Sequence, residues 1–265
     1  MGARGPGGGA PRHVTAIRFE LERAIVENQL VLHYQPRVLV ETKKVRGVEA
    51  LLRWHNPQRG LVSPLDFIPT AEREGLIRDI EAWVVREALL TSTVWHRDGL
   101  DLGVSVNVSP RVLHDAQFMR LIRHALRIQR TPRAFVVEIS AAGAAAEPEL
   151  PHEALGELRS AGVRVALDDV TSLEQLERTR GVRWDYVKLG RAVIGAAARD
   201  PDTAALARSL VEAVRPSGAR LAAVGVEDDA ALAMARDLGC YLAQGYLFAA
   251  PMPQKELFDW LRGQI

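Results

Sequence analysis

Short apolar runs alternate with longer segments of helical periodicity along most of the chain. Such alternation predicts a parallel β-sheet with helices packed against its outside. The apolar runs predict strands at residues 30–36, 46–54, 102–108, 135–139, 163–169, 186–189, 220–226 and 241–248. The periodic segments predict helices at residues 15–28, 66–75, 79–98, 116–130, 151–160, 173–178, 203–215, 230–238 and 255–261.

The connection between the first two predicted strands is too short for a crossing helix. Only the polar segment 41–44 lies at its centre, so these two strands should be antiparallel neighbours. No Gly-rich phosphate loop follows any predicted strand, which disfavours a doubly wound dinucleotide-binding sheet. Eight strands in 265 residues therefore predict an α/β fold, a (β/α)8 TIM-like barrel with an antiparallel first strand.

Two adjacent carboxylates end the predicted strand at 163–169. Successive strand residues point to opposite faces, so Asp168 and Asp169 can both face inward only where the strand ends. Acids at the end of a buried strand are costly unless a cation or hydrogen-bond donors receive them. The alternative is that Asp169 caps the helix that follows.

The balance of charges limits the classes of partner. The 34 basic residues are offset by 33 acidic ones, and the net charge of +1 gives no general attraction for nucleic acid or for an anionic membrane. Hydrophobic residues make up 48% of the chain, enough for a sizeable core. The single cysteine, Cys240, excludes an internal disulfide and a cysteine-based zinc site.

The ends of the chain suggest one folded domain. Residues 1–14 are rich in glycine and proline and predict a flexible tail, and residues 15–265 predict the barrel. No apolar run reaches the length of a membrane span, and no signal-peptide core follows the start. We expect a cytoplasmic protein without membrane contact by this domain, or the cytoplasmic domain of a larger or membrane-anchored protein.

Polar side chains gather where the predicted strands end, which is where barrels carry their functional groups. These residues are Glu49, Asn107, Glu138, Asp168, Asp169, Lys188 and Gln244. Carboxylate and amide oxygens together suit a hard divalent cation, Mg²⁺, Mn²⁺ or Ca²⁺. The alternative is that each acid pairs separately with one of the many arginines.

A series of short motifs runs through the chain in a fixed order. They are Tyr-Gln-Pro at 34–36, Glu-Ala-Leu-Leu-Arg-Trp at 49–54, Gly-Leu-Val-Ser-Pro at 60–64, Phe-Ile-Pro at 67–69, Val-Asn-Val-Ser at 106–109, Leu-Asp-Asp at 167–169 and Gln-Gly-Tyr-Leu-Phe at 244–248. In this order, over about residues 16–262, the chain resembles the EAL domain family of cyclic di-GMP phosphodiesterases.

The resemblance implies a site where two cations hold an activated water in line with one phosphodiester of cyclic di-GMP, yielding linear pGpG. It implies cation ligands at Glu49, Asn107, Glu138, Asp168 and Asp169, with Asp168 shared by both cations. It implies that Lys188 lies near the attacking water, so Lys188 and Asp169 are the candidate catalytic residues. It implies nucleotide contacts at Gln35, Leu51, Arg53, Gln244 and Glu227.

The sequence departs from the family pattern at the general-base position. The family's Ala-Glu-Gly-Val-Glu is Ala-Val-Gly-Val-Glu here, so the first glutamate is replaced by Val224. Valine can neither bind a cation nor take a proton. Losing a positioned base costs ~10²–10⁴-fold in rate, and a weakened second cation adds to that loss.

Three further departures surround the same half of the site. The acid of the family's Glu-x-Thr-Glu is Ala141, and the aspartate of Lys-Ile-Asp is Gly190. The loop at 169–172 is shortened and lacks the family's glycines. We expect one Mg²⁺ or Mn²⁺ site to remain and the second to be weakened.

Three hypotheses of function follow. The first is a degenerate EAL domain that binds cyclic di-GMP as a sensor or effector, with lost or strongly impaired phosphodiesterase activity. The second is a slow, metal-dependent cyclic di-GMP phosphodiesterase giving pGpG. The third is a protein-protein interaction module, with a protein partner or a homodimer, that no longer binds the nucleotide.

Overall fold

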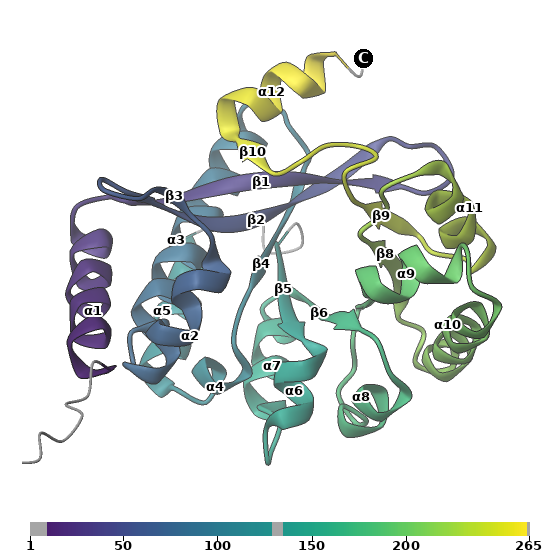
Figure 1. The fold of residues 1–265 in the computed structure, drawn as a ribbon, viewed down its shortest axis with the longest axis horizontal. Helices are drawn as coiled ribbons and strands as arrows, with labels where there is room; N and C mark the ends of the chain where they lie inside the picture. The colour runs from purple at the N-terminus through teal and green to yellow at the C-terminus, as the bar shows by residue number, and fades with distance from the viewer. Residues whose placement is uncertain (1–9, 129–134, 264–265) are drawn as a thin grey trace, which may run out of the picture.

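Eight strands close into a barrel in the computed structural model, which describes residues 10–128 and 135–263 (Figure 1). They are β1 (Leu30–Leu39), β2 (Val45–Asn56), β4 (Gly103–Asn107), β5 (Phe135–Ser140), β6 (Arg164–Val170), β7 (Tyr186–Leu189), β8 (Arg220–Val224) and β9 (Leu242–Gln244). Strands β2 and β4 to β9 are parallel neighbours in sequence order, and β1 closes the barrel by pairing antiparallel with both β2 and β9. The predicted barrel with an antiparallel first strand is confirmed.

Two short strands extend the sheet outside the barrel and were not predicted. Strand β3 (Gly60–Val62) pairs with the end of β2, and β10 (Met252–Pro253) pairs with β1. The last barrel strand is shorter than predicted, because the chain turns after Gln244. There Val226 donates to the Gln244 carbonyl at 3.0 Å, and a Cβ on Gly245 would collide with the Val226 backbone.

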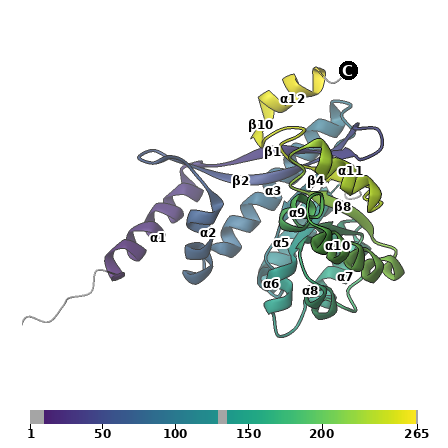
Figure 2. The same ribbon diagram turned by 45° about the vertical axis from the view of Figure 1, so that its right-hand side comes forward.

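Helices cover the outside of the barrel. They are α1 (Ala10–Val26), α2 (Pro64–Arg73), α3 (Ile77–Arg97), α4 (Pro110–Leu113), α5 (Ala116–Ile128), α6 (Ala141–Ala146), α7 (His152–Ser160), α8 (Leu173–Arg178), α9 (Arg191–Ala197), α10 (Pro201–Val214), α11 (Asp229–Asp237) and α12 (Gln254–Arg262), with a 3-10 turn at Arg215–Ser217. In both ribbon views α1 stands beside α2, away from the barrel (Figures 1 and 2). Helices α4, α6 and α9 were not predicted, since runs of four to seven residues seldom show periodicity, although the six-residue α8 was predicted.

The first helix begins at Ala10, five residues before the predicted start. Its second residue is Pro11, which the first helical turn tolerates because the N–H there has no partner within the helix. Residues 1–9 of the predicted tail lie outside the described residues, as do residues 129–130 at the end of the helix predicted at 116–130. Among residues 10–128 and 135–263, none of the helices combines the length and the hydropathy needed to cross a bilayer.

The buried side chains form a large core and a smaller one. The large core lies between the barrel strands and the surrounding helices. The smaller core joins α1, α2 and the end of β2, where the Trp54 and Phe67 rings pack edge to face at 5.6 Å between centroids. A third set of apolar side chains fills one end of the barrel interior: Val136, Ala166, Tyr186, Ala222 and Leu242. The other end of the interior is polar.

Candidate functional site

The end of β6 separates the two adjacent aspartates. Asp169 has a φ of +55°, and the pairing with β7 shifts between Leu167 and Val170. This irregularity leaves the Asp168 side chain largely buried and Asp169 exposed. The following helix, α8, is capped by Ser172, whose hydroxyl accepts from the Gln175 N–H at 3.3 Å. Capping therefore does not account for Asp169.

Three carboxylates converge inside the barrel from three different strands. Oxygens of Glu49 (β2), Glu138 (β5) and Asp168 (β6) all lie within 4.8 Å of one another. The Lys188 ammonium from β7 lies among them, with Nζ 3.0 Å from Glu49, 2.6 Å from Glu138 and 2.9 Å from Asp168. The structure thus joins four of the residues that the sequence placed at strand ends: the three acids share the Lys188 ammonium, and Glu138 also pairs with an arginine, Arg37.

Amide side chains complete the network around Glu49. Asn107 Nδ2 donates to Glu49 Oε1 at 2.8 Å, and Gln244 Nε2 donates to Glu49 Oε2 at 3.0 Å. The same Gln244 amide donates to Gln35 Oε1 at 2.8 Å, and Gln35 donates to the Ala249 carbonyl at 3.0 Å. Both oxygens of Glu49 are therefore fixed by partners from three strands, Asn107 of β4, Lys188 of β7 and Gln244 of β9.

The surroundings shift the pKa values of the three acids in different directions. Burial opposes the ionisation of Glu49, but the Lys188 ammonium and the Asn107 amide outweigh it and lower the pKa of Glu49 to about 2. Burial and the neighbouring Glu49 charge raise the pKa of Glu138 to about 7, and burial also raises the pKa of Asp168. Despite its burial, the pKa of Lys188 is raised by the three carboxylates. Burial thus favours the protonated form of Glu138 and of Asp168, whereas Lys188 and Asn107 favour the ionised form of Glu49.

The donor set fits one divalent cation. The three carboxylates offer oxygen ligands only, which suits hard cations such as Mg²⁺ or Mn²⁺. The buried Oδ1 of Asp168 forms an ion pair with Lys188 at 2.9 Å and has no other partner among the described residues. An oxygen in that situation is available as a ligand.

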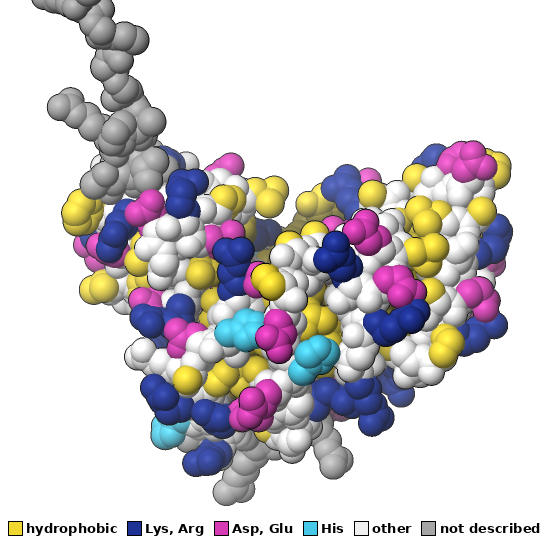
Figure 3. All heavy atoms as spheres, turned by 90° about the horizontal axis from the view of Figure 1, so that it is seen from below, with side chains coloured by type: hydrophobic (Ala, Val, Ile, Leu, Met, Phe, Trp, Pro, Cys, Tyr) yellow, Lys and Arg dark blue, Asp and Glu magenta, His cyan; other side chains and the backbone are white. Residues whose placement is uncertain are grey.

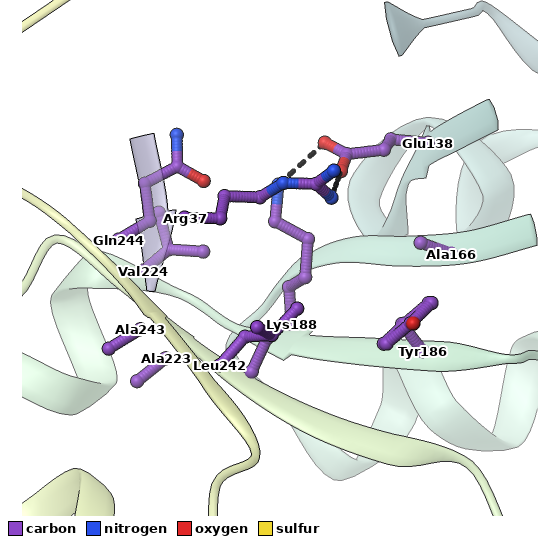
Figure 4. A pocket seen from close by; sticks show the side chains of 11 residues that line it. Arg37, Glu138, Ala166, Tyr186, Lys188, Ala223, Val224, Leu242, Ala243 and Gln244 are labelled. Atoms are coloured by element: carbon purple, nitrogen blue, oxygen red, sulfur yellow. Dashed lines mark hydrogen bonds and ion pairs between the residues drawn. The ribbon is translucent and has the colours of Figure 1, made fainter. Parts of the chain in front are cut away.

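The other half of the predicted site lies around Val224, Glu227 and Asp169. Val224 lines a cavity of about 10 Å³ together with Lys188 and Gln244, and its side chain has no ligand atom (Figure 4). Glu227, predicted to contact the nucleotide, is exposed and pairs with Arg191 at 2.6 Å. Of the two predicted ligands of the second cation, Asp168 belongs to the converged carboxylates and Asp169 does not.

A cleft of about 500 Å³ opens beside the cluster. It reaches from Asn107 and Glu138 to Leu51, one of the predicted nucleotide contacts, and on to α3. Arg53 lies further along β2, half-buried, and donates to the Leu52 carbonyl at 2.7 Å. The cleft brings a predicted ligand contact next to the predicted cation site.

Sequence reasoning missed Glu81 in the wall of this cleft. Both of its carboxyl oxygens face the Ser109 N–H, at 2.9 and 3.0 Å, and burial raises the pKa of Glu81 to about 8. The signal in the sequence is an acid beside Ile80 on the apolar face of the helix predicted at 79–98, where Val84 also points. A charged residue at such a position is rare without a function or a partner.

Sequence reasoning also missed Arg37, which is buried in the barrel. Its Nη1 lies 3.3 Å from Glu138 Oε1. The signal is its position two residues after Gln35, because alternate residues of a strand share one face.

One face of the molecule, seen from below the view of Figure 1, carries basic and acidic side chains interspersed (Figure 3). Such a mixture on this face agrees with the net charge of +1.

Comparisons with known proteins agree with the motifs. The family model described as EAL domain matches residues 18–251. The bifunctional diguanylate cyclase/cyclic di-GMP phosphodiesterase MucR of Pseudomonas aeruginosa is 35% identical over 241 residues, which cover 90% of this chain and 35% of that protein. The cyclic di-GMP phosphodiesterase PdeR of Escherichia coli is 32% identical over 247 residues, 91% of this chain and 37% of that protein. The chain thus spans about a third of the length of these curated relatives.

A solved structure gives the same result for the fold. The PaMucR phosphodiesterase, in a complex with c-di-GMP, superposes with a TM-score of 0.82 at 34% sequence identity. The superposition covers 91% of this chain and 99% of that chain.

Proposed function

Because the chain belongs to the EAL domain family, we propose that it binds cyclic di-GMP as a sensor or effector and that its phosphodiesterase activity is lost or strongly impaired. One observation carries this proposal. The half of the site that holds Glu49, Glu138 and Asp168 is converged, while the position of the general base is Val224, which lines the same cavity as Lys188. Ligand contacts can persist where the base for the chemistry is missing.

The proposed nucleotide site joins the cleft to the barrel network. Arg53 offers a charged donor for a phosphate, and Gln35 and Gln244 hold the adjoining edge of the site. Leu51 supplies apolar surface in the cleft. The complex of the PaMucR phosphodiesterase with c-di-GMP supports this choice of ligand.

We assign Mg²⁺ or Mn²⁺ to the converged half, held by Glu49, Glu138 and Asp168 with Asn107 beside them. Such a cation, when bound, polarises a phosphate oxygen or a water. The chain's own contribution is to keep the three carboxylates together through Lys188.

A second candidate is a slow, metal-dependent phosphodiesterase. It is favoured by the retention of Asp168, Asp169 and Lys188. The third candidate, a protein-interaction module or homodimer that has lost the nucleotide, is favoured by the glycine-free loop at 169–172.

Calorimetric titration with cyclic di-GMP in Mg²⁺, and again in EDTA, separates these candidates. We expect binding without conversion to pGpG. Arg53→Ala should weaken binding ~10–100-fold, the value of a charge-assisted hydrogen bond to phosphate. Arg208→Ala, at an exposed position of α10, is the matched control and should bind as the unaltered protein does. Rapid metal-dependent turnover would overturn the claim of impaired chemistry, and absence of heat in both buffers would overturn nucleotide binding.

A further inference from the structure

A second buried cation, Arg37, lies in the barrel next to the carboxylate cluster. The residue is 7% exposed, and it projects inward from β1. Its Nη1 lies 3.3 Å from Glu138 Oε1 (Figure 4), and its Nη2 lies 3.5 Å from the Gly103 carbonyl oxygen. Because Lys188 donates to the other oxygen of Glu138 at 2.6 Å, this carboxylate lies between two cations.

Gly47 leaves space that the guanidinium of Arg37 fills. Arg37 pairs with Gly47 of β2, and Gly47 pairs with Gly103 of β4. A Cβ on Gly47 would lie 3.0 Å from Arg37 Nη2 and would collide with the Gly103 carbonyl. Three neighbouring strands therefore combine to accommodate one large charged side chain at this position.

The charge of the cluster is nearly balanced by the protein's own side chains. When Glu49, Glu138 and Asp168 are all ionised, as they are with a divalent cation bound, they face two buried cations, Arg37 and Lys188, and one negative charge is in excess. An arginine keeps its charge at all accessible pH values. One divalent cation would change this total from −1 to +1, and a second would raise it to +3 before any ligand binds.

The geometry keeps Arg37 pointed at Glu138. Among the described residues Arg37 Nε has no hydrogen-bond partner, and neither does the buried Oε1 of Gln244. Both residues line the cavity of about 10 Å³, which has room for about one water. The carboxylate of Glu138 is therefore the one charged partner of Arg37 in the described structure.

We propose that Arg37 is a permanent internal counter-cation of this site: a positioning residue that holds Glu138 and lowers the affinity of the carboxylate cluster for divalent cations. The proposal rests on the cation site of the proposed function. Its physical basis is that a fixed positive charge a few ångströms from the ligands repels a divalent cation strongly in a buried, poorly screened site. The consequence is a site that takes up one weakly held cation and resists a second.

The test is a titration with Mn²⁺ alone, followed by calorimetry and by the EPR signal of free Mn²⁺. The variants are Arg37→Met, which removes the charge at similar length, and Arg37→Lys, which keeps it. Arg37→Met should bind Mn²⁺ about tenfold more tightly than the unaltered protein, and Arg37→Lys should stay within about threefold of it. Equal or weaker Mn²⁺ binding by folded Arg37→Met overturns the proposal, as does an absence of Mn²⁺ binding in all three proteins.

The melting temperature, measured with and without Mn²⁺, is a second readout. It can be used even if Arg37→Met folds poorly. Mn²⁺ should raise the melting temperature of Arg37→Met more than that of the unaltered protein, because the variant has lost a compensating charge. A variant that folds only when Mn²⁺ is present supports the proposal, and one that Mn²⁺ does not rescue overturns it. Because these experiments use no nucleotide, their result does not depend on whether the protein binds cyclic di-GMP.

Discussion

Lys188 Nζ donates to Glu138 Oε2 at 2.6 Å, and the same ammonium lies within 3.0 Å of two further carboxylates from other strands. Strand β7 therefore ties β2, β5 and β6 together at the polar end of the barrel interior. A single side chain compensates charges that would otherwise repel one another in a buried site.

Removing this ammonium should destabilise the fold. Lys188→Met leaves three buried carboxylates with only Arg37 nearby, and breaking a buried ion pair costs ~3–5 kcal/mol. Urea denaturation at pH 7 measures the free energy of unfolding. Lys44→Met, at an exposed position of the β1–β2 connection, is the control and should change that free energy by less than ~0.5 kcal/mol. A loss below about 1 kcal/mol in Lys188→Met would contradict its role as the shared counter-charge.

Restoring an acid at position 224 should raise hydrolysis. Val224 lines the cavity that Lys188 and Glu138 also line, so a glutamate there would lie beside the cluster (Figure 4). We expect Val224→Glu to increase pGpG formation from cyclic di-GMP by ~10-fold or more, since a positioned base contributes ~10²–10⁴-fold. Val224→Gln has the same shape without the base and should stay at the original rate. An unchanged rate in Val224→Glu would mean that the shortened loop at 169–172, and not position 224, accounts for the low phosphodiesterase activity that we propose.

Gly190 should be intolerant of a side chain for a steric reason. A Cβ at this position would collide with Asp169 Oδ1 and would lie 2.9 Å from Thr171 Cγ2. Gly190→Ala should therefore lower the free energy of unfolding by ~1–3 kcal/mol, as overpacking does. Gly195→Ala is the matched control, because no described atom lies within 4 Å of a Cβ there and alanine favours the helix α9 by ~0.5–1 kcal/mol. Equal melting temperatures for the two variants would show that Asp169 moves aside freely.

Glu81 should make stability fall as the pH rises. Burial raises the pKa of Glu81 to about 8 in the folded protein, against 4.5 as its ordinary value. Between these values the folded state keeps a proton that the unfolded state has lost, so the free energy of unfolding falls with pH by up to ~1.4 kcal/mol per unit. The contribution of neutral Glu81 is fully present below pH 4.5 and is lost by about pH 8.

The variant Glu81→Gln removes this titration. Urea denaturation from pH 5 to pH 8 should show a smaller decline in stability than in the unaltered protein, with the difference greatest at pH 8. The same slope in both proteins would mean that Glu81 is ionised in the folded state throughout this range.

The sequence predicted the barrel because its signals are local. The short segment at 41–44 identified the antiparallel pair, and the apolar runs located all eight barrel strands. The prediction of strand ends was wrong where contacts between distant residues determine where the chain turns. The strand ends at Gln244 because the chain turns at Gly245, which lies against the backbone of Val226, 19 positions earlier. The following Tyr246 and Leu247 look strand-like by composition alone.

The residues of the candidate site were also predicted only in part. Acids at strand ends could be found by position, and Glu49, Glu138 and Asp168 do converge. Arg37 and Glu81 were missed because their significance lies in burial and in distant partners. Arg37 meets a carboxylate 101 positions away, and nothing in its local pattern identifies that partner.

Strand β2 belongs to two packing units at once. Its Glu49 end lies in the barrel, and its Trp54 end is clamped by the small core that α1 and α2 complete. Arg53 lies between the two, next to Trp54 in the chain. The position of Arg53 therefore depends on the packing of α1 and α2 as well as on the barrel, whereas Glu49 is held by side chains from other barrel strands.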